Sequence, residues 1–304
     1  MDWTTTSPVT WSRMPKPHLF RAFALTMAIL IVTHWICGMA AAKAGSMTSA
    51  RIISTNICID TLLVALADRA TITAMSPLAA DRRFSTIADK VVGIPAVKFT
   101  AEDIYRLKPT IVFVSNFASP RTRAALTKLG ITVVAVNYAR SIDDIKANII
   151  SMGQALGTED TAGQLTAMLD MAATIHPLPR PLSALQYSRD KFTHGTHSLI
   201  ADIISKAGFI RPDRLSGSAY GMFLSSEEVL MANPDLLVLD KFTAYDSYNL
   251  KGEYLGFDRD STQQRQTAFV DTKLWSCGSP AASQLIKHLN ILGQHIKKNN
   301  YVQK

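Results

Sequence analysis

The sequence predicts an α/β protein of two lobes, each built on a parallel sheet, that are joined by one long helix and enclose a ligand cleft. Three observations predict this fold. Corresponding positions of segments 100–115 and 225–240 carry residues of matching chemical class. One helix–strand unit therefore occurs twice. Short apolar runs alternate with helical patterns along the rest of the chain. A continuous helical pattern at 159–175 separates the two copies, and it would be about 25 Å long at 1.5 Å per residue.

Each copy of the repeated unit begins with a helix-capping signal. A hydroxyl N-cap is followed by an acid at the third helical position, which indicates a capping box. These pairs are Thr100 with Asp103 and Ser225 with Glu228. Glu102 and Glu227 then fall at the same place in the two copies, so a pseudo-twofold axis would make them a symmetric pair. A chance match of two helix–strand units is the alternative.

The first lobe is expected over residues 45–158. Apolar runs predict its strands, and capped or glycine-ended amphipathic segments predict its helices. The expected strands are 51–54, 71–75, 111–114 and 131–136. The expected helices are 57–67, 121–129, 141–156 and the short helix after Thr100.

The connecting helix is expected within 159–177, because the proline-rich segment after His176 cannot continue a helix. The second lobe follows at 178–304. Its expected strands are 182–187, 236–239 and 268–271, and its expected helices are 198–207, 225–232 and 280–292. A polar, tyrosine-containing loop lies between Asp240 and Gln266, and loops that long are commonly functional.

Residues 1–44 have the pattern of a secretory signal peptide. A basic leader precedes an apolar run at 22–36, and Ala42-Lys43-Ala44 is a small-x-small cleavage signal. Cleavage is therefore expected after Ala44. An uncleaved membrane anchor is one alternative, and a lipoprotein attached through Cys37 is another.

The composition is that of a globular protein, with 47% apolar residues. Removal of residues 1–44 takes away four basic residues and one acidic residue, leaving 28 against 23 and a net charge of +5. No cluster of Lys and Arg is interleaved with aromatics, so nucleic acid is not an expected partner. A basic cleft for an anionic ligand would explain the surplus charge, and a surplus without any functional meaning would explain it equally well.

Two cysteines, Cys58 and Cys277, remain after the expected cleavage. In an oxidising compartment such a pair usually forms a disulfide. Because the two residues lie near opposite ends of the chain, two separately buried cysteines are an equal alternative.

Common enzyme and metal signatures are absent from the sequence. It contains no phosphate-binding Gly-x4-Gly-Lys, no Gly-x-Ser-x-Gly, no His-Glu-x-x-His and no Cys-x-x-Cys. His194 and His197 flank Gly195 without a nearby third ligand, which favours a loop over a metal site. No catalysis, metal or cofactor is therefore expected.

Glu102 and Glu227 could form a catalytic acid–base pair, as in glycosidases. Each lies in the first turn of an expected helix, where the helix dipole favours the ionised carboxylate. This opposes the raised pKa that an acid catalyst needs. A pair of exposed docking charges is the better interpretation.

Aromatic and cationic residues follow the expected strands, where ligands of parallel sheets bind. Such a wall suits a large, flat or apolar ligand with polar or anionic edges. The candidate ligand-binding residues are Asn56, Cys58, Arg82, Arg83, Phe84, Asn116, Phe117, Tyr138, Tyr187, Tyr220, Lys241, Phe242, Tyr245, Trp275 and Cys277.

A series of loose motifs in a specific order resembles one known family. The motifs are Arg51-Ile-Ile-Ser54, Glu-x-Ile-x-x-Leu-Lys-Pro-x-Ile-Val from Glu102, Leu129-Gly-Ile-x-Val, Gly195-Thr-x-Ser-Leu-Ile-x-x-Ile-x-x-x-Ala-Gly208, 227–238 and Leu274-Trp-x-Cys-Gly-x-Pro280. Together they resemble the periplasmic substrate-binding proteins of ABC importers for iron complexes and cobalamin, over essentially the whole mature chain.

The resemblance implies two Rossmann-like lobes joined by one long helix, a ligand held between them and small hinge motion. It also implies a periplasmic location and docking of Glu102 and Glu227 on arginines of the importer's transmembrane subunits. Trp275 matches a tryptophan that lines the cleft of cobalamin binders. The histidine ligands of zinc and manganese members are replaced here by Asn56 and Ile57, which disfavours a metal ion.

The leading hypothesis is a monomeric periplasmic receptor that captures a ferric siderophore, a related iron complex or cobalamin for an ABC importer. A secreted two-lobed hydrolase using Glu102 and Glu227 is the first alternative. The second is a haem-binding protein with Tyr220, Tyr245 or His194 as the iron ligand.

Overall fold

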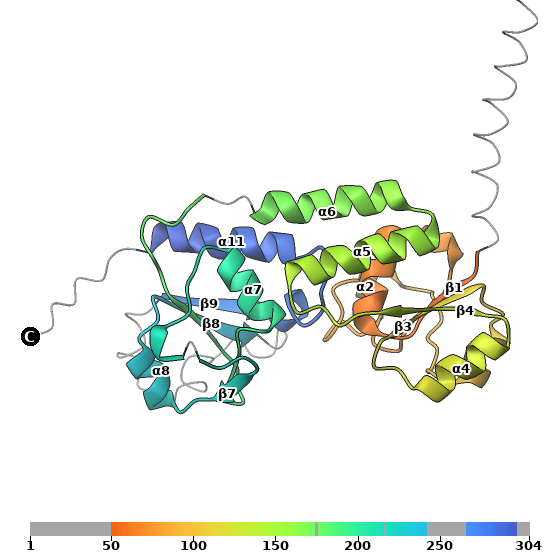
Figure 1. Cartoon of the computed structure of the whole chain (residues 1–304), viewed down its shortest axis with the longest axis horizontal. Coiled ribbons are helices and arrows are strands. Elements are labelled where there is room, and N and C mark those ends of the chain that lie inside the picture. Colours follow the sequence, from red (N-terminus) through yellow and green to blue (C-terminus); the bar gives the residue numbers. More distant parts are fainter. Residues whose placement is uncertain (1–49, 174–175, 216, 242–265, 297–304) are drawn as a thin grey trace, which may run out of the picture. The chain divides into compact units, whose positions relative to one another are not determined.

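The computed structural model of this 304-residue chain describes residues 50–173, 176–215, 217–241 and 266–296. These residues form two lobes with a parallel sheet in each, as the sequence predicts (Figure 1). Within these ranges no helix is both long and apolar enough to cross a bilayer. The expected signal peptide lies outside the described residues.

The first lobe is a four-stranded parallel sheet in the order β2-β1-β3-β4. Its strands are β1 Ile52–Ser54, β2 Ile72–Ala74, β3 Ile111–Ser115 and β4 Thr132–Val136. Its helices are α2 Ile57–Leu66, α3 Ala101–Arg106, α4 Pro120–Lys128 and α5 Ile142–Leu156, with short 3-10 turns η1 Arg69–Thr71 and η2 Ala88–Lys90. Every strand and helix expected for this lobe is present, to within one or two residues at most ends.

The second lobe holds a three-stranded parallel sheet in the order β5-β8-β9. Its strands are β5 Ala184–Tyr187, β8 Leu236–Lys241 and β9 Gln266–Asp271. Its helices are α7 Leu199–Lys206, α8 Ser226–Ala232 and α11 Ala282–His295, with 3-10 turns η3 Asp213–Leu215 and η5 Thr272–Leu274. An antiparallel pair, β6 Phe192–His194 with β7 Gly221–Phe223, was not expected from the sequence.

The two repeated helices are capped as expected, but only one has the full capping box. Ser225 Oγ accepts from the Glu228 N–H at 3.2 Å, and Glu228 Oε2 accepts from the Ser225 N–H at 2.7 Å. Thr100 Oγ1 likewise accepts from the Asp103 N–H at 3.1 Å. The Asp103 carboxylate, on a side chain one methylene shorter than glutamate, instead accepts the Thr100 hydroxyl at 2.8 Å. The prediction of a reciprocal box is therefore wrong for α3.

A long helix, α6 Glu159–Ala173, follows α5 directly and packs against both α5 and α11 (Figure 1). Gly157 ends α5 in the left-handed conformation, with φ of 68°, which glycine adopts at little cost. Helix α6 thus connects helices of both lobes, as expected. The predicted end of this helix at residue 175 lies outside the described residues.

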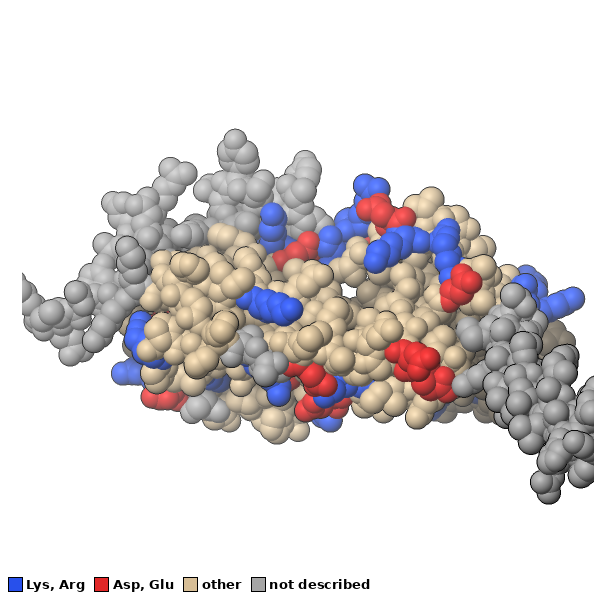
Figure 2. Space-filling view, turned by 90° about the horizontal axis from the view of Figure 1, so that it is seen from above, with Lys and Arg blue, Asp and Glu red and all other residues tan. Residues whose placement is uncertain are grey.

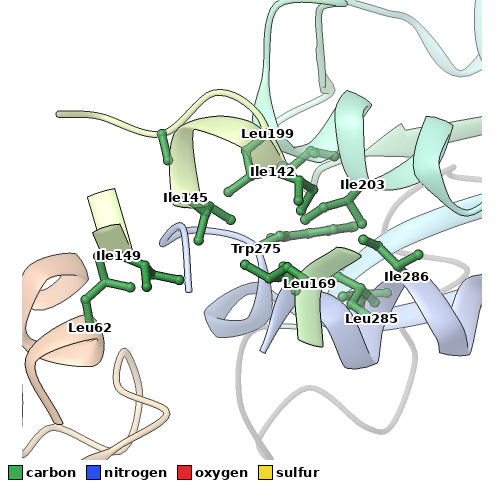
Figure 3. Packing of buried hydrophobic residues seen from close by; sticks show 14 of the residues in the cluster. Leu62, Ile142, Ile145, Ile149, Leu169, Leu199, Ile203, Trp275, Leu285 and Ile286 are labelled. Carbon is green, nitrogen blue, oxygen red and sulfur yellow. The ribbon is translucent and has the colours of Figure 1, made fainter. Parts of the chain in front are cut away.

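One hydrophobic core runs through both lobes. It joins Leu62 and Ile149 of the first lobe to Leu285 and Ile286 of the second, with Leu169 of α6 among them (Figure 3). Trp275 lies in this core and is only 3% exposed. Its ring packs among aliphatic side chains in this structure, and the expected contact of Trp275 with a ligand stays a prediction.

Candidate ligand-binding site

A disulfide joins the two lobes at the edge of the candidate site. Cys58 lies in the first turn of α2, and Cys277 follows Trp275 in the second lobe. Their sulfur atoms are bonded across 219 positions of sequence, with the Cα atoms 4.8 Å apart. The disulfide alternative is therefore confirmed. Both cysteines become part of a fixed crosslink and are not free thiols.

The backbone around this disulfide fits closely against the first lobe. A Cβ on Gly278 would lie 2.5 Å from Ala139 Cβ and 2.9 Å from Ile145 Cγ1. Only glycine leaves room for this approach, since real Cβ atoms do not come so near. The glycine of the Cys-Gly pair thus lets the segment after Cys277 pack against the start of α5.

A hollow of about 180 Å³ opens beside the disulfide, at the carboxyl ends of β1, β3 and β4. Four predicted residues line it, namely Asn56, Cys58, Phe117 and Tyr138. Sequence reasoning missed the smaller polar members Ser115, Asn137, Asn148 and Ser276. The carboxyl ends of parallel strands are where ligands bind in open α/β sheets.

Phe117 and Tyr138 form an exposed aromatic pair on the rim of this hollow. Their ring centroids lie 6.2 Å apart at an interplanar angle of 53°. The side chains are 77% and 57% exposed, so the core does not use their apolar surface. Such a pair can cover an apolar ligand.

Polar contacts fix the loops that carry this pair. Asn148 of α5 is buried, donating to the Asn137 carbonyl at 2.8 Å and accepting from the Asn137 N–H at 3.2 Å. Ser115 Oγ accepts from the Phe117 N–H at 3.2 Å. Asn116, also a predicted ligand residue, has an exposed side chain and donates its backbone N–H to Val136.

The basic loop 81–84 lies against the second lobe, because Lys273 Nζ donates to the Arg82 carbonyl at 3.1 Å. Both predicted arginines have acidic partners: Arg82 pairs with Asp89 at 2.5 Å and Arg83 with Asp81 at 2.6 Å. The Arg83 hydrogen bond lowers the pKa of Asp81 to about 2. Arg83 also lies 5.4 Å over the ring of Phe84, which is 47% exposed.

The predicted tyrosines of the second lobe have different environments. Tyr187 is 0% exposed and donates its hydroxyl to the Leu224 carbonyl at 2.9 Å. Its ring belongs to a small core with Leu215, Val229 and Leu239, and its expected contact with a ligand stays a prediction. Tyr220 is 82% exposed and meets His197 edge to face at 6.0 Å.

Three other predicted positions follow Asp240 in the sequence. Lys241 is half-buried at the last position of β8, next to the buried Asp240. Burial raises the pKa of Asp240 to about 6. A hydrogen bond from Gln186 Nε2 at 3.3 Å acts in the opposite direction but is the smaller effect. Phe242 and Tyr245 lie outside the described residues.

His194 is half-buried on β6 and packs edge to face on Phe192 at 5.2 Å. Burial lowers the pKa of its imidazole, which favours the neutral ring. In the described part of the chain, no three His, Cys, Asp or Glu side chains are grouped to hold a metal ion.

Glu102 and Glu227 are both exposed in the first turns of α3 and α8. Glu102 forms an i,i+4 ion pair with Arg106 at 2.5 Å. The carboxylate of Glu227 accepts a hydrogen bond from the backbone N–H of Glu227 and another from the Ser225 side chain. Both hydrogen bonds lower the pKa of Glu227. A lowered pKa is the opposite of what a general acid needs, which argues against Glu227 as the acid of a glycosidase-like pair.

Charged side chains do not gather into one stripe on the face above α5 and α6. Figure 2 shows Lys and Arg interspersed with Asp and Glu on that face, with broad uncharged areas between them.

Comparison with known proteins gives one family and a consistent fold. The sequence profile of the family described as "Periplasmic binding protein" matches residues 52–282. No protein with a curated description matches the chain.

Three solved structures illustrate the similarity. The periplasmic haem-binding protein RhuT from Roseiflexus sp. RS-1 has 22% identity and a TM-score of 0.65, over 81% of this chain and 98% of that one. The periplasmic haem-binding protein HutB of Vibrio cholerae has 18% identity and a TM-score of 0.68, over 80% and 98%. The periplasmic vitamin B12 binding protein BtuF of Vibrio cholerae has 16% identity and a TM-score of 0.61, over 83% and 99%. At these identities the similarity concerns the fold.

Proposed function

Because the chain belongs to the periplasmic binding protein family, we propose that it captures a ferric siderophore, a related iron complex or cobalamin for an ABC importer. The observation that carries this proposal is the exposed pair Phe117 and Tyr138 on the rim of the hollow at the strand ends. In this proposal the protein is an exported monomer that performs no catalysis and binds no nucleic acid.

The chemistry of the rim favours a large ligand with both apolar and polar surface. The two aromatic rings supply apolar contact, while the neighbouring Asn56, Asn137 and Asn148 supply amide groups. Arg82 and Arg83 lie on a loop that contacts the second lobe, but their acidic partners reduce the charge that they can offer. We therefore expect aromatic contact to contribute more to affinity than ion pairing.

Haem is a second candidate ligand. Haem-binding proteins are among the similar structures, and Tyr220 presents an 82% exposed phenol beside His197. An exposed phenol is a suitable axial ligand for haem iron.

We propose further that Glu102 and Glu227 dock the receptor on its importer. Replacing both with glutamine should reduce uptake of the ligand by about tenfold, since two exposed charge pairs of about 0.7 kcal/mol each correspond to that factor. The affinity of the purified protein for its ligand should not change, because both carboxylates are exposed and lie in helices away from the hollow. Uptake into cells and calorimetric affinity are the two measurements.

Glu159→Gln is the matched control, because Glu159 is an exposed first-turn glutamate of α6. It should leave both uptake and affinity unchanged. Equal uptake by the wild type and the double variant would contradict the docking role. Loss of a hydrolytic activity in the double variant would support the hydrolase instead.

A further inference from the structure

The two copies of the helix–strand unit hold their helices in equivalent positions. Ile104 of α3 and its counterpart Val229 of α8 are both 0% exposed, and each packs with the strand that follows its helix. A left-handed residue follows each helix, namely Lys108 with φ of 48° and Asn233 with φ of 41°. Because the backbones correspond, differences between the two exposed surfaces come from their side chains.

In the first copy, Glu102 shares the helix surface with a cation. Arg106 Nη2 lies 2.5 Å from Glu102 Oε1, and the two side chains are 70% and 74% exposed. Residues four apart lie on the same face of a helix, so the geometry of α3 holds this pair together. A cationic group of a partner must therefore compete with Arg106 for the carboxylate, and the charge of Arg106 also repels that group.

In the second copy, Glu227 has no such neighbour on its helix. The position that corresponds to Arg106 is Met231, which carries no charge and is 59% exposed. Within the described ranges no Lys or Arg forms an ion pair with Glu227. The same face of α8 thus presents a carboxylate one turn before an exposed apolar side chain.

One cation does act on Glu227 from outside α8. Lys191 lies in the turn between β5 and β6, and its carbonyl accepts from the Leu224 N–H at 2.8 Å, which holds this turn to the start of α8. The hydrogen bonds from the Glu227 N–H and from Ser225 lower the pKa of Glu227, and the charge of Lys191 lowers it less. The carboxylate is therefore ionised and open to a cation of a partner.

We propose that the two docking ends are unequal: the importer makes its main ionic contact with Glu227, beside the apolar Met231, whereas Arg106 masks Glu102. This inference rests on the docking role proposed above. The partner surface that meets the second lobe then carries a cationic side chain next to an apolar one. The surface that meets the first lobe faces an ion pair without net charge.

Binding to spheroplasts tests this inference without a known ligand, because spheroplasts expose the periplasmic side of the inner membrane. They are prepared from source cells that lack their own copy of the receptor and are titrated with the labelled chain from residue 45 onward. Glu227→Gln should weaken binding about fivefold and Glu102→Gln about twofold, the two ends of the range for exposed ion pairs. Both losses together account for the tenfold effect expected of the double variant.

Exchanging the residues four positions after each glutamate is the sharper test. Arg106→Met should raise the affinity about twofold and should make Glu102→Gln cost about fivefold in that background. Met231→Arg should lower the affinity about twofold and reduce the cost of Glu227→Gln to about twofold. Lys287→Met is the matched control, since it removes an exposed cation from α11, which packs on the opposite face of the second sheet from α8. It should bind like the wild type.

The outcomes separate this inference from the docking role itself. Equal losses from Glu102→Gln and Glu227→Gln, or Arg106→Met without a gain in affinity, would overturn the inference and leave the docking role standing. Full binding by the double variant, or no saturable binding by the wild type, would contradict both. Far-UV circular dichroism and the melting temperature of each variant distinguish a weakened contact from a loss of folding.

Discussion

Replacing Trp275 with alanine is expected to lower the free energy of unfolding by about 3–5 kcal/mol, the range for truncating a buried tryptophan. The ring is 3% exposed and lies in the core that both lobes share, near Ile203 and Leu285 (Figure 3). Truncation would leave a cavity that residues from two lobes must close together. Urea-induced unfolding of the wild type and the variant measures this loss.

Trp275→Phe is the control, because it keeps an aromatic ring of smaller volume and should cost clearly less. The same variants show whether Trp275 acts as a core residue or as a ligand contact. A core residue costs stability whether or not ligand is present. If Trp275→Ala instead unfolds like the wild type and loses only ligand affinity, the side chain faces the ligand and its placement in the core is wrong.

Loss of the disulfide is expected to lower the free energy of unfolding by about 5 kcal/mol. The bond closes a loop of 219 positions, and the chain-entropy relation gives about that value for a loop of such length. The crosslink also holds the first turn of α2 to the segment that follows the core tryptophan. Unfolding in urea with and without a phosphine reductant gives the measurement.

The variant with both Cys58→Ser and Cys277→Ser should match the reduced wild type and should not respond to the reductant. Either single serine variant leaves one free thiol and serves as a check on exchange between molecules. A double variant as stable as the oxidised wild type would show that the bond does not restrain the unfolded chain.

The order of strands and helices could be predicted because each element has its own local signal. The N-caps Thr100 and Ser225 and the C-cap glycine Gly157 set helix ends through backbone chemistry that is visible in sequence. The pair β6 and β7 could not be predicted, since neither Phe-Thr-His nor Gly-Met-Phe is an apolar run and the two strands pair across α7.

The candidate site could be predicted only as a region. Strand ends locate a residue along the chain, but they do not give the direction of its side chain. Phe117 and Tyr138 are exposed there, whereas Tyr187 and Trp275, chosen by the same rule, are buried. Burial depends on what packs above the strand end, and that information comes from distant segments.

A cavity of about 360 Å³ in the second lobe, which Thr193 and Arg211 line among others, had no signal in the sequence. The two residues are separated by all of α7, and neither belongs to a recognisable motif. Their relation arises from the Arg211 hydrogen bond to the His194 carbonyl, which the fold alone brings about.

The most direct test of the proposed function is a thermal-shift measurement on the chain from residue 45 onward, with ferric siderophores, haem and cobalamin in parallel. A ligand at a hundredfold its dissociation constant should stabilise the wild type by about 2.7 kcal/mol. The double variant Phe117→Ala, Tyr138→Ala should lose most of that shift, while Tyr105→Ala, an exposed aromatic on α3, should keep it. The proposed function would be contradicted if none of these ligands raised the melting temperature, or if the double variant responded like the wild type.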